Sequence, residues 1–249
     1  MRGQARYLRI VEGHERHIHT RPYAVEVGPD SGFETKAVLG TVPVEGDGSA
    51  WFRVPAGRSV FFSVLDGKFQ ALHTMRSVTN VQSGERTGCV GCHEPMAQAP
   101  PMQAALALRR GPSDITPPPW GVRAMSYAEL VQPVLGRHCV RCHDGSKGEK
   151  KAFDLTAKTS KPFMGYQVPL SYFHLRRYVR HAPIRTYFLP PLSFGSRASK
   201  LMQHLGKGHN GVTLDEAEWR VLCAWIDCNA PALDNFEKVK APRIADAGR

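Results

Sequence analysis

The amino-acid sequence predicts an α+β fold, with an N-terminal antiparallel β module followed by a mainly α-helical domain. Apolar and polar residues alternate in short runs between residues 6 and 78, and glycine, proline and aspartate separate these runs. Helix-capping patterns and apolar residues at helical spacing appear after residue 126. Proline is concentrated in between. We therefore predict a β-rich module over 1–111, a Pro-rich linker over 112–125, a helical domain over 126–238 and a basic tail over 239–249.

The β module is predicted from short alternating runs. The first two cover residues 7–11 and 23–27. A meander is predicted from the following four runs, which turns at 46–49, 56–57 and 66–67 would join: 38–44, 50–55, 59–65 and 68–72. Residues 80–88 then read as loop, and a short apolar helix is compatible with 102–108.

The helical domain is predicted to open at the capping box Ser126-Tyr127-Ala128-Glu129. The helix that follows contains Pro133, which must kink it or restart it in a first turn. Further helices are predicted at 171–180 and 199–205.

The last helix is predicted to begin at a second capping box, Thr213-Leu214-Asp215-Glu216, and to end before Pro231. Cys223 and Cys228 on this helix are five residues apart, about 140° around its axis. We therefore expect them to be packed thiols that do not bridge each other.

One pentapeptide pattern, C-x-x-C-H, occurs twice, as Cys89-Val90-Gly91-Cys92-His93 and as Cys139-Val140-Arg141-Cys142-His143. Two thiols at this spacing can form thioethers with the two vinyl groups of one porphyrin, and the histidine then lies beneath the iron. A chain with 6 Cys and 11 His would contain one match roughly 0.006 times by chance. The repeat predicts two covalent c-type haems, with His93 and His143 as iron ligands.

The surroundings of the second motif predict a cytochrome c-like haem domain. A helix runs into the motif, and the last helix is rich in aromatic residues. In cytochrome c folds, two such helices pack across each other beside the haem.

Cysteine pairs at this spacing also occur in zinc ribbons and in thioredoxin-like dithiol sites. Zinc ribbons place their two C-x-x-C halves about 15 to 20 residues apart, whereas 46 residues separate Cys92 from Cys139. A thioredoxin-like dithiol requires a βαβ pattern around the pair, and neither motif has one.

Composition limits the class of protein. The chain has 249 residues, of which 42% are hydrophobic and 22% charged, as in ordinary globular proteins. No apolar run is long enough for a membrane helix, so no membrane span is predicted. The net charge is +11, but lysine and arginine are scattered and no nucleic-acid motif accompanies them. We expect a solvated basic surface, with docking on an acidic redox partner as the functional alternative, and no nucleic-acid partner.

Haem attachment to C-x-x-C-H takes place outside the cytoplasm, so we expect a periplasmic or equivalent compartment. The chain begins without a signal-peptide pattern. We therefore expect it to be part of a longer, exported protein.

Distal iron ligands are predicted from the remaining histidines and methionines. For the second haem we select His209, because it alone is flanked by glycines that let the backbone approach the porphyrin, in contrast to His174, His181 and His204. For the first haem we expect a weak distal ligand or none; the candidates are His14, His17, His19, His73, Met96 and Met102.

The sequence also resembles a known family, the hydrazine synthase alpha subunits. The resemblance rests on the run 38–44, Asp47-Gly48-Ser49-Ala50, Val54-Pro55-Ala56-Gly57, the first motif with Glu94-Pro95, the run 131–135, the second motif, Ser193-Phe194-Gly195-Ser196, residues 208–212 and Trp225-Ile226-Asp227. It spans about residues 36 to 232 and lacks the upstream part, which includes most of a β-propeller.

This resemblance implies a catalytic first haem and a bis-histidine second haem that passes electrons. In the family a tyrosine four residues after the first motif histidine ligates the catalytic iron; here that position is Ala97. We therefore expect a dihaem electron-transfer module of a larger haem complex, with other subunits or domains as partners. The alternatives are a haem enzyme that acts on a small nitrogen or oxygen compound at an open site on the first haem, and a zinc-binding scaffold.

Overall fold

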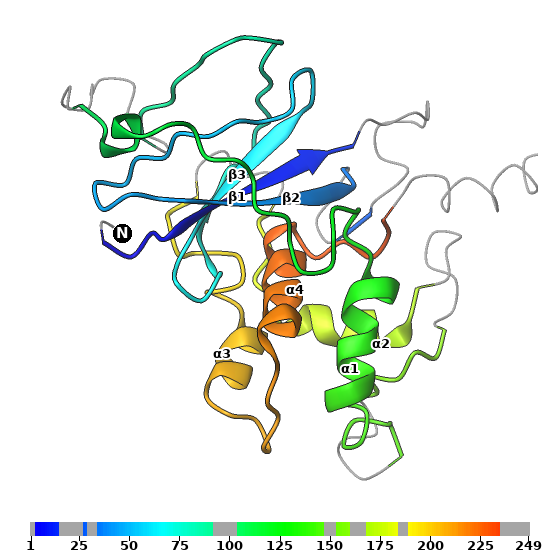
Figure 1. Cartoon of the computed structure of the whole chain (residues 1–249). Helices are drawn as coiled ribbons and strands as arrows, with labels where there is room; N and C mark the ends of the chain where they lie inside the picture. The colour runs from blue at the N-terminus through cyan, green and yellow to red at the C-terminus, as the bar shows by residue number, and fades with distance from the viewer. Residues whose placement is uncertain are drawn as a thin grey trace, which may run out of the picture.

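A computed structural model of the chain (Figure 1) describes residues 3–14, 27–28, 34–91, 104–146, 153–159, 168–183 and 189–234. Within these ranges an antiparallel sheet lies above a group of short helices, with α4 (Glu216–Asp227) central among them. The strands precede the four α-helices along the chain, so the predicted α+β class is confirmed.

The sheet has four strands in the order β2-β1-β3-β4, and all neighbours are antiparallel. The strands are β1 (Tyr7–Gly13), β2 (Lys36–Pro43), β3 (Val60–Leu65) and β4 (Ala71–Thr74). The predicted meander is wrong, because β1 lies between β2 and β3. Its consecutive residues Arg9, Ile10 and Val11 are all buried, which fits a central strand covered on both faces.

The run 50–55 does not form the predicted strand. It makes one isolated bridge, between Phe52 and Ser113. Phe52 and Val54 instead pack on the sheet face that carries Ile10 and Leu39. The apolar residues of this run therefore cover the sheet without joining its hydrogen-bond ladder.

The predicted turn at Asp66-Gly67 is confirmed as the hairpin between β3 and β4. The Asp66 carboxylate accepts hydrogen bonds from the backbone N–H groups of Lys68 (2.9 Å) and Gln70 (3.0 Å). These amides make no hydrogen bond within the sheet, so the Asp66 side chain stabilises the turn by accepting from them.

The Pro-rich connector runs along β2. Thr41 and Thr116 exchange backbone hydrogen bonds, both of 3.0 Å, and Ala37 bridges to Ala124. A Cβ atom on Gly40 would lie 2.1 Å from the Thr116 carbonyl oxygen, so only glycine allows this approach. The linker bounds 112–125 stay a prediction, but the described connector is part of the packed structure.

The first helical segment follows its sequence signals. The Ser126 hydroxyl accepts a hydrogen bond from the Glu129 N–H (3.3 Å) at the start of a π-helical turn, η2 (Tyr127–Val131). Pro133 lies in the first turn of the next helix, α1 (Gln132–His138), where its missing N–H costs no hydrogen bond. Of the two predicted alternatives, a kink or a restart, the structure shows Pro133 in the first turn of a new α-helical segment.

The other short helices lie near the predicted positions. They are η1 (Leu106–Arg109), α2 (Leu170–Leu175), η4 (Arg176–Tyr178) and α3 (Lys200–Gly206).

The last helix, α4, begins two residues later than its predicted capping box would require. The N-cap is Asp215, whose side chain accepts from the Glu218 N–H (2.7 Å), while the Glu218 carboxylate accepts from the Asp215 N–H (3.1 Å). Thr213 is not part of the box. Acidic residues also interact favourably with the helix N-terminus, and Glu218 is needed at this position for contacts with α1.

One apolar cluster joins the sheet to the helices. Val11, Val38 and Phe61 from the sheet belong to the same buried cluster as Leu135, Leu222 and Trp225. Trp225 is fully buried, and its indole N–H donates to the Pro231 carbonyl (2.9 Å). Cys223 and Cys228 are both buried and free, so the predicted packed thiols are confirmed.

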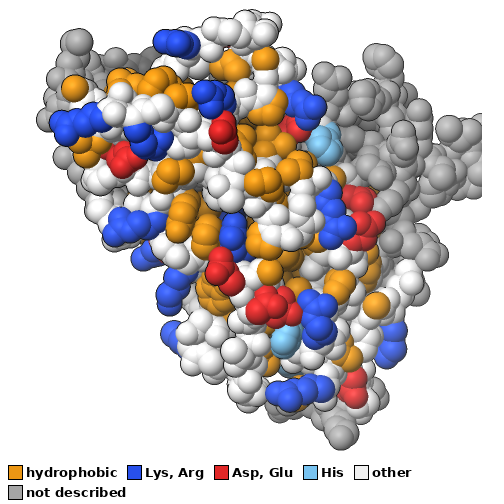
Figure 2. All heavy atoms as spheres, in the orientation of Figure 1, with side chains coloured by type: hydrophobic (Ala, Val, Ile, Leu, Met, Phe, Trp, Pro, Cys, Tyr) orange, Lys and Arg blue, Asp and Glu red, His pale blue; other side chains and the backbone are white. Residues whose placement is uncertain are grey.

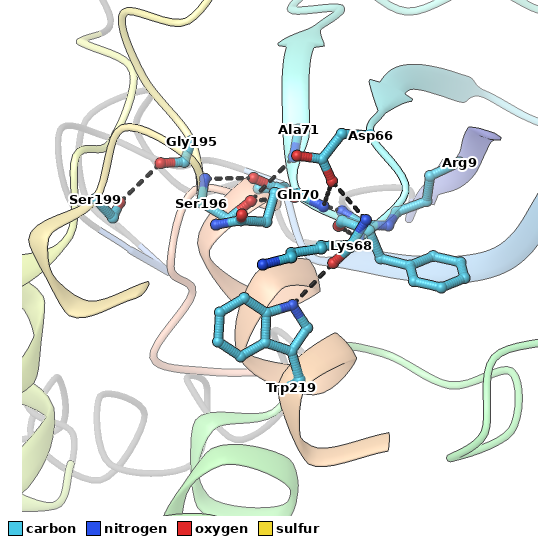
Figure 3. A network of polar contacts seen from close by, with 11 residues as sticks. Arg9, Asp66, Lys68, Gln70, Ala71, Gly195, Ser196, Ser199 and Trp219 are labelled. Atoms are coloured by element: carbon cyan, nitrogen blue, oxygen red, sulfur yellow. Dashed lines mark hydrogen bonds and ion pairs between the residues drawn. The ribbon is translucent and has the colours of Figure 1, made fainter. Parts of the chain in front are cut away.

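A buried polar network ties α4 to the sheet (Figure 3). The Arg9 guanidinium donates to the Asp227 carboxylate (2.6 Å), which also accepts from the Ser196 N–H (2.7 Å). The Ser196 hydroxyl in turn accepts from the Ala71 N–H of β4 (3.0 Å). Burial raises the pKa of Asp227, and the adjacent Arg9 opposes this rise. Each polar group thus has a partner, which such burial requires.

The surface is mixed in character. On the face drawn in Figure 2, lysine and arginine side chains lie dispersed among acidic and apolar ones. Within the described ranges, no helix combines the length and apolar character needed to cross a membrane.

Candidate functional site

The second C-x-x-C-H motif continues directly from α1. Cys139 is the C-cap residue, and its N–H donates to the Leu135 carbonyl (2.8 Å). The N–H groups of Cys142 (3.1 Å) and His143 (3.0 Å) both donate to the Cys139 carbonyl. The motif is therefore a compact hydrogen-bonded turn, with Cys142 exposed and Cys139 partly buried. Burial raises the pKa of the Cys139 thiol to about 11, and Cys142 adds to this rise, so the thiol is neutral at pH 7.

The end of α1 is fixed to the first turn of α4 through Glu218. The Arg137 Nε donates to the Glu218 carboxylate (2.9 Å), and the His138 Nε2 lies 2.9 Å from it. Burial raises the pKa of the Glu218 carboxyl, but hydrogen bonds from His138, the Asp215 amide and Arg137 outweigh this, and its pKa is lowered. These hydrogen bonds join the helix before the motif to the last helix, whereas the predicted crossing of the two helices beside a haem stays a prediction.

The His143 and His209 rings are stacked beside the second motif. Their ring centroids are 6.1 Å apart and their planes differ by only 12°. Tyr7 and Phe69, which stack in contact with a similar interplanar angle of 10°, have centroids 4.5 Å apart. The two imidazoles are thus parallel but further apart than a contacting pair.

The His209 loop reverses sharply between α3 and α4. Gly208, Asn210 and Gly211 all have positive φ (82°, 49° and 72°), and the Val212 N–H donates to the His209 carbonyl (2.9 Å). Arg141 of the motif reaches the Asn210 carbonyl at 3.5 Å, and the Asn210 amide nitrogen lies 3.4 Å from the His209 Nε2. The predicted glycine-flanked loop therefore lies beside the motif, as the choice of His209 requires.

The segment that contains Phe153 and Leu155 contacts His143 from another side. The Leu155 N–H donates to the His143 carbonyl (2.8 Å), and the Phe153 ring meets the imidazole edge to face with centroids 5.1 Å apart. Sequence reasoning missed this segment. Its only signal was a pair of apolar residues after a charged loop.

The competing histidines have other neighbours. His174 on α2 packs edge to face on Phe153 (5.8 Å), and burial lowers its pKa. His204 on α3 lies against Tyr178 (6.2 Å). His181 follows η4 in coil.

The first motif is only partly described. Residues 82–91 are all exposed and contain no helix or strand, so the predicted loop before the motif is confirmed there. Cys89 is exposed, whereas Cys92 and His93 lie outside the described residues. His73, one predicted ligand, is buried on β4 against Phe194 (6.0 Å). His14 follows β1, and its N–H donates to the Thr35 carbonyl (2.9 Å). His17, His19, Met96 and Met102 lie outside the described residues.

The second motif has the donor types that a c-type haem requires, two free thiols and two neighbouring imidazoles. A metal–imidazole bond is about 2 Å long, and a ring nitrogen lies about 1 Å from its centroid, so two axial imidazoles place their centroids about 6 Å apart. The observed 6.1 Å is close to this value, but the two rings are stacked, and an axial imidazole directs an in-plane nitrogen at the iron, so both side chains would turn to bind one haem. Among the described residues, no group of three or more His, Cys, Asp and Glu is arranged to hold a bare metal ion.

Comparisons with known proteins agree with the sequence resemblance over part of the chain. Residues 3–94 match the family model of the hydrazine synthase alpha subunit middle domain. The structure is similar to Kuenenia stuttgartiensis hydrazine synthase, with a TM-score of 0.69 and 18% identity. That match covers 94% of this chain and 40% of the solved chain, so this chain spans less than half its length. No curated protein matches the sequence.

Proposed function

We propose that this chain is a dihaem c-type electron-transfer module within a longer, exported protein related to the hydrazine synthase alpha subunits. The closeness of His143 and His209, whose ring centroids lie 6.1 Å apart beside the second motif, carries this proposal most directly. The repeated C-x-x-C-H spacing and the family match over residues 3–94 support it independently.

In the second site, Cys139 and Cys142 would form the thioethers, and His143 and His209 would be the two axial ligands. A bound haem supplies an iron that alternates between ferrous and ferric states. Two imidazoles on one iron would leave no position for a substrate. Glu218 of α4 ties the end of α1 beside the motif, an arrangement that would limit rearrangement when the charge of a bound iron changes. These properties favour electron transfer over catalysis at this site.

The first site would use Cys89, Cys92 and His93. A second candidate function, a haem oxidoreductase acting on a small nitrogen or oxygen compound, depends on this site. The observation in its favour is the exposure of the described part of the motif, where Val90 is 69% exposed. A loop in this position would let a small molecule approach. Ala97 replaces the tyrosine that the resemblance would place after the motif, so the proposal does not include hydrazine synthesis.

The proposed partners and compartment follow from the same assignment. We expect the partners to be the remaining domains or subunits of a larger haem complex and an acidic redox protein. The expected compartment is the periplasm or its equivalent. The net charge of +11 supports an acidic redox partner, because complementary charge accelerates the association of redox proteins.

Expression with a c-type maturation system tests the proposal. Mass spectrometry of the denatured chain should detect two covalent haem additions. Double replacement of Cys139 and Cys142 by Ser should remove one of them, and replacement of Cys89 and Cys92 should remove the other. A chain that carries zinc and no haem would contradict the proposal. Carbon monoxide binding by the ferrous protein at the first site would favour the oxidoreductase.

A further inference from the structure

A buried glutamine lies at the start of the helix that carries the second motif. Gln132 is 8% exposed, and both ends of its amide are hydrogen bonded. The Nε2 donates to the Leu155 carbonyl (3.0 Å), and the Oε1 accepts from the Ser171 hydroxyl of α2 (2.5 Å). A buried amide without such partners is destabilising, so these contacts fix the position of the side chain.

Leu155 connects this glutamine to the proposed proximal ligand. Its carbonyl accepts from Gln132, and its N–H donates to the His143 carbonyl (2.8 Å). The chain thus forms a closed circuit, which runs along α1 from Gln132 to Cys139, through the motif to His143, and back through Leu155. The residue after the thioether cysteines is tied to the start of their own helix.

The same segment contacts the His143 side chain. Phe153 meets the imidazole edge to face at 5.1 Å, with 80° between the ring planes. Asp154, which lies between Phe153 and Leu155 in the sequence, is 7% exposed and packs against Gly145, whose φ is +74°. A Cβ atom on Gly145 would lie 2.8 Å from the Asp154 carboxylate. The segment therefore has little freedom to shift without moving the imidazole.

We propose that Gln132 is a positioning residue that sets the orientation of the His143 imidazole through Leu155 and Phe153, and thereby the reduction potential of the second haem. This inference rests on the proposed function. Groups outside the ligand set orient metal-ligating histidines and adjust the properties of the metal. Gln132 acts on the segment that holds the ligand and touches neither the imidazole nor the iron.

The test compares Gln132→Met with Gln203→Met in the mature dihaem protein. Methionine nearly preserves the volume of glutamine and removes both hydrogen bonds at position 132. Gln203 is an exposed glutamine on α3, so the same chemical change there is a matched control. The readouts are the haem count by mass, the midpoint potential in an optical redox titration, and the low-spin electron paramagnetic resonance spectrum.

Gln132→Met should keep two haems, shift the midpoint potential of one of them and change the g-values of its low-spin signal. Gln203→Met should leave both readouts unchanged. Ser171→Ala, which removes the hydrogen bond to the Gln132 Oε1 and keeps the one from Nε2 to Leu155, should produce a smaller shift in the same direction and keeps the test decisive if Gln132→Met accumulates poorly. Two haems with unchanged potentials and spectra in both the Gln132 and Ser171 variants would overturn the inference and leave the proposed function standing. Loss of haem from the unmodified chain would instead overturn the proposed function.

Discussion

The two C-x-x-C-H motifs share a spacing but differ in their surroundings. Cys139 ends a helix, is partly buried, and precedes a histidine that faces a second imidazole. Cys89 is exposed in a loop in which every residue from 82 to 91 is exposed. The spacing determines which group can be attached, whereas the surroundings determine what the attached group can do. A packed site with two histidines suits electron transfer, and an open loop suits access by a small molecule.

The largest expected effect is on the spin state of the second haem. In His209→Ala, the ferric iron at the second motif should change from low spin to high spin, because one strong axial ligand is lost. The ferrous form should then bind carbon monoxide at this site. Optical and electron paramagnetic resonance spectra measure both changes.

His174→Ala and His204→Ala are the matched controls, since their rings pack on Phe153 and Tyr178. Both should keep the low-spin spectrum of the unmodified protein. A high-spin His174 or His204 variant beside an unchanged His209 variant would identify a different ligand.

The next effect concerns the core under the second motif. Trp225→Ala should lower the free energy of unfolding by about 3–5 kcal/mol, because Trp225 is fully buried among the helices and donates to Pro231. Trp51→Ala, at a partly exposed position, should lower the free energy of unfolding by less. Urea unfolding followed by circular dichroism compares the two. Equal losses would mean that the core around α4 does not dominate stability.

A smaller, pH-dependent effect is expected at Glu218. Its pKa is lowered in the folded chain, so the folded state binds fewer protons there and the ionised group stabilises the fold above its ordinary pKa of 4.5. Glu218→Gln should lower the free energy of unfolding by about 1–3 kcal/mol at pH 7. This difference from the unmodified protein should shrink as the pH falls below about 4.5 and Glu218 itself becomes protonated.

Unfolding in urea at pH 7 and at pH 3.5 checks this prediction. Glu216→Gln is the control, since Glu216 pairs with Arg220 on the surface and its side chain is 73% exposed. That change should alter stability by less than about 1 kcal/mol at either pH. A pH-independent loss in Glu218→Gln would show that the charge of Glu218 is unimportant.

The smallest effect is expected at the first motif. Val90→Ala removes apolar surface that is already 69% exposed, so stability should change by less than about 0.5 kcal/mol. Val140→Ala at the equivalent, half-buried position of the second motif should cost more. Thermal unfolding of the two variants tests the contrast between the motifs directly.

Local signals predicted much of the helical half, because a few neighbouring residues determine them. Ser126, Pro133 and the glycines around His209 each indicate a backbone conformation that the structure contains. The prediction placed the last capping box two residues too early, because two tetrapeptides fit the pattern almost equally well, Thr213-Leu214-Asp215-Glu216 and Asp215-Glu216-Ala217-Glu218. Only the contact of Glu218 with α1 distinguishes them, and that contact is remote in sequence.

Long-range pairing limited the prediction of the sheet. Alternation identified β1, β2 and β3 but not the insertion of β1 between the other two, since every strand offers the same backbone groups on both edges. The Phe153–Leu155 contact with His143 was missed for a similar reason, because it depends on how a loop closes. The haems and their ligands stay predictions at both motifs.

The Arg9–Asp227 pair joins residues that are 218 positions apart. Contacts between such distant residues require nearly the whole chain to be available, and their formation is slow compared with local helices and hairpins. We expect both C-x-x-C-H motifs to be synthesised, and their thiols to stay accessible, before the Arg9–Asp227 pair can form. Covalent attachment would then precede final packing, so the order of maturation would follow from the position of a single buried ion pair.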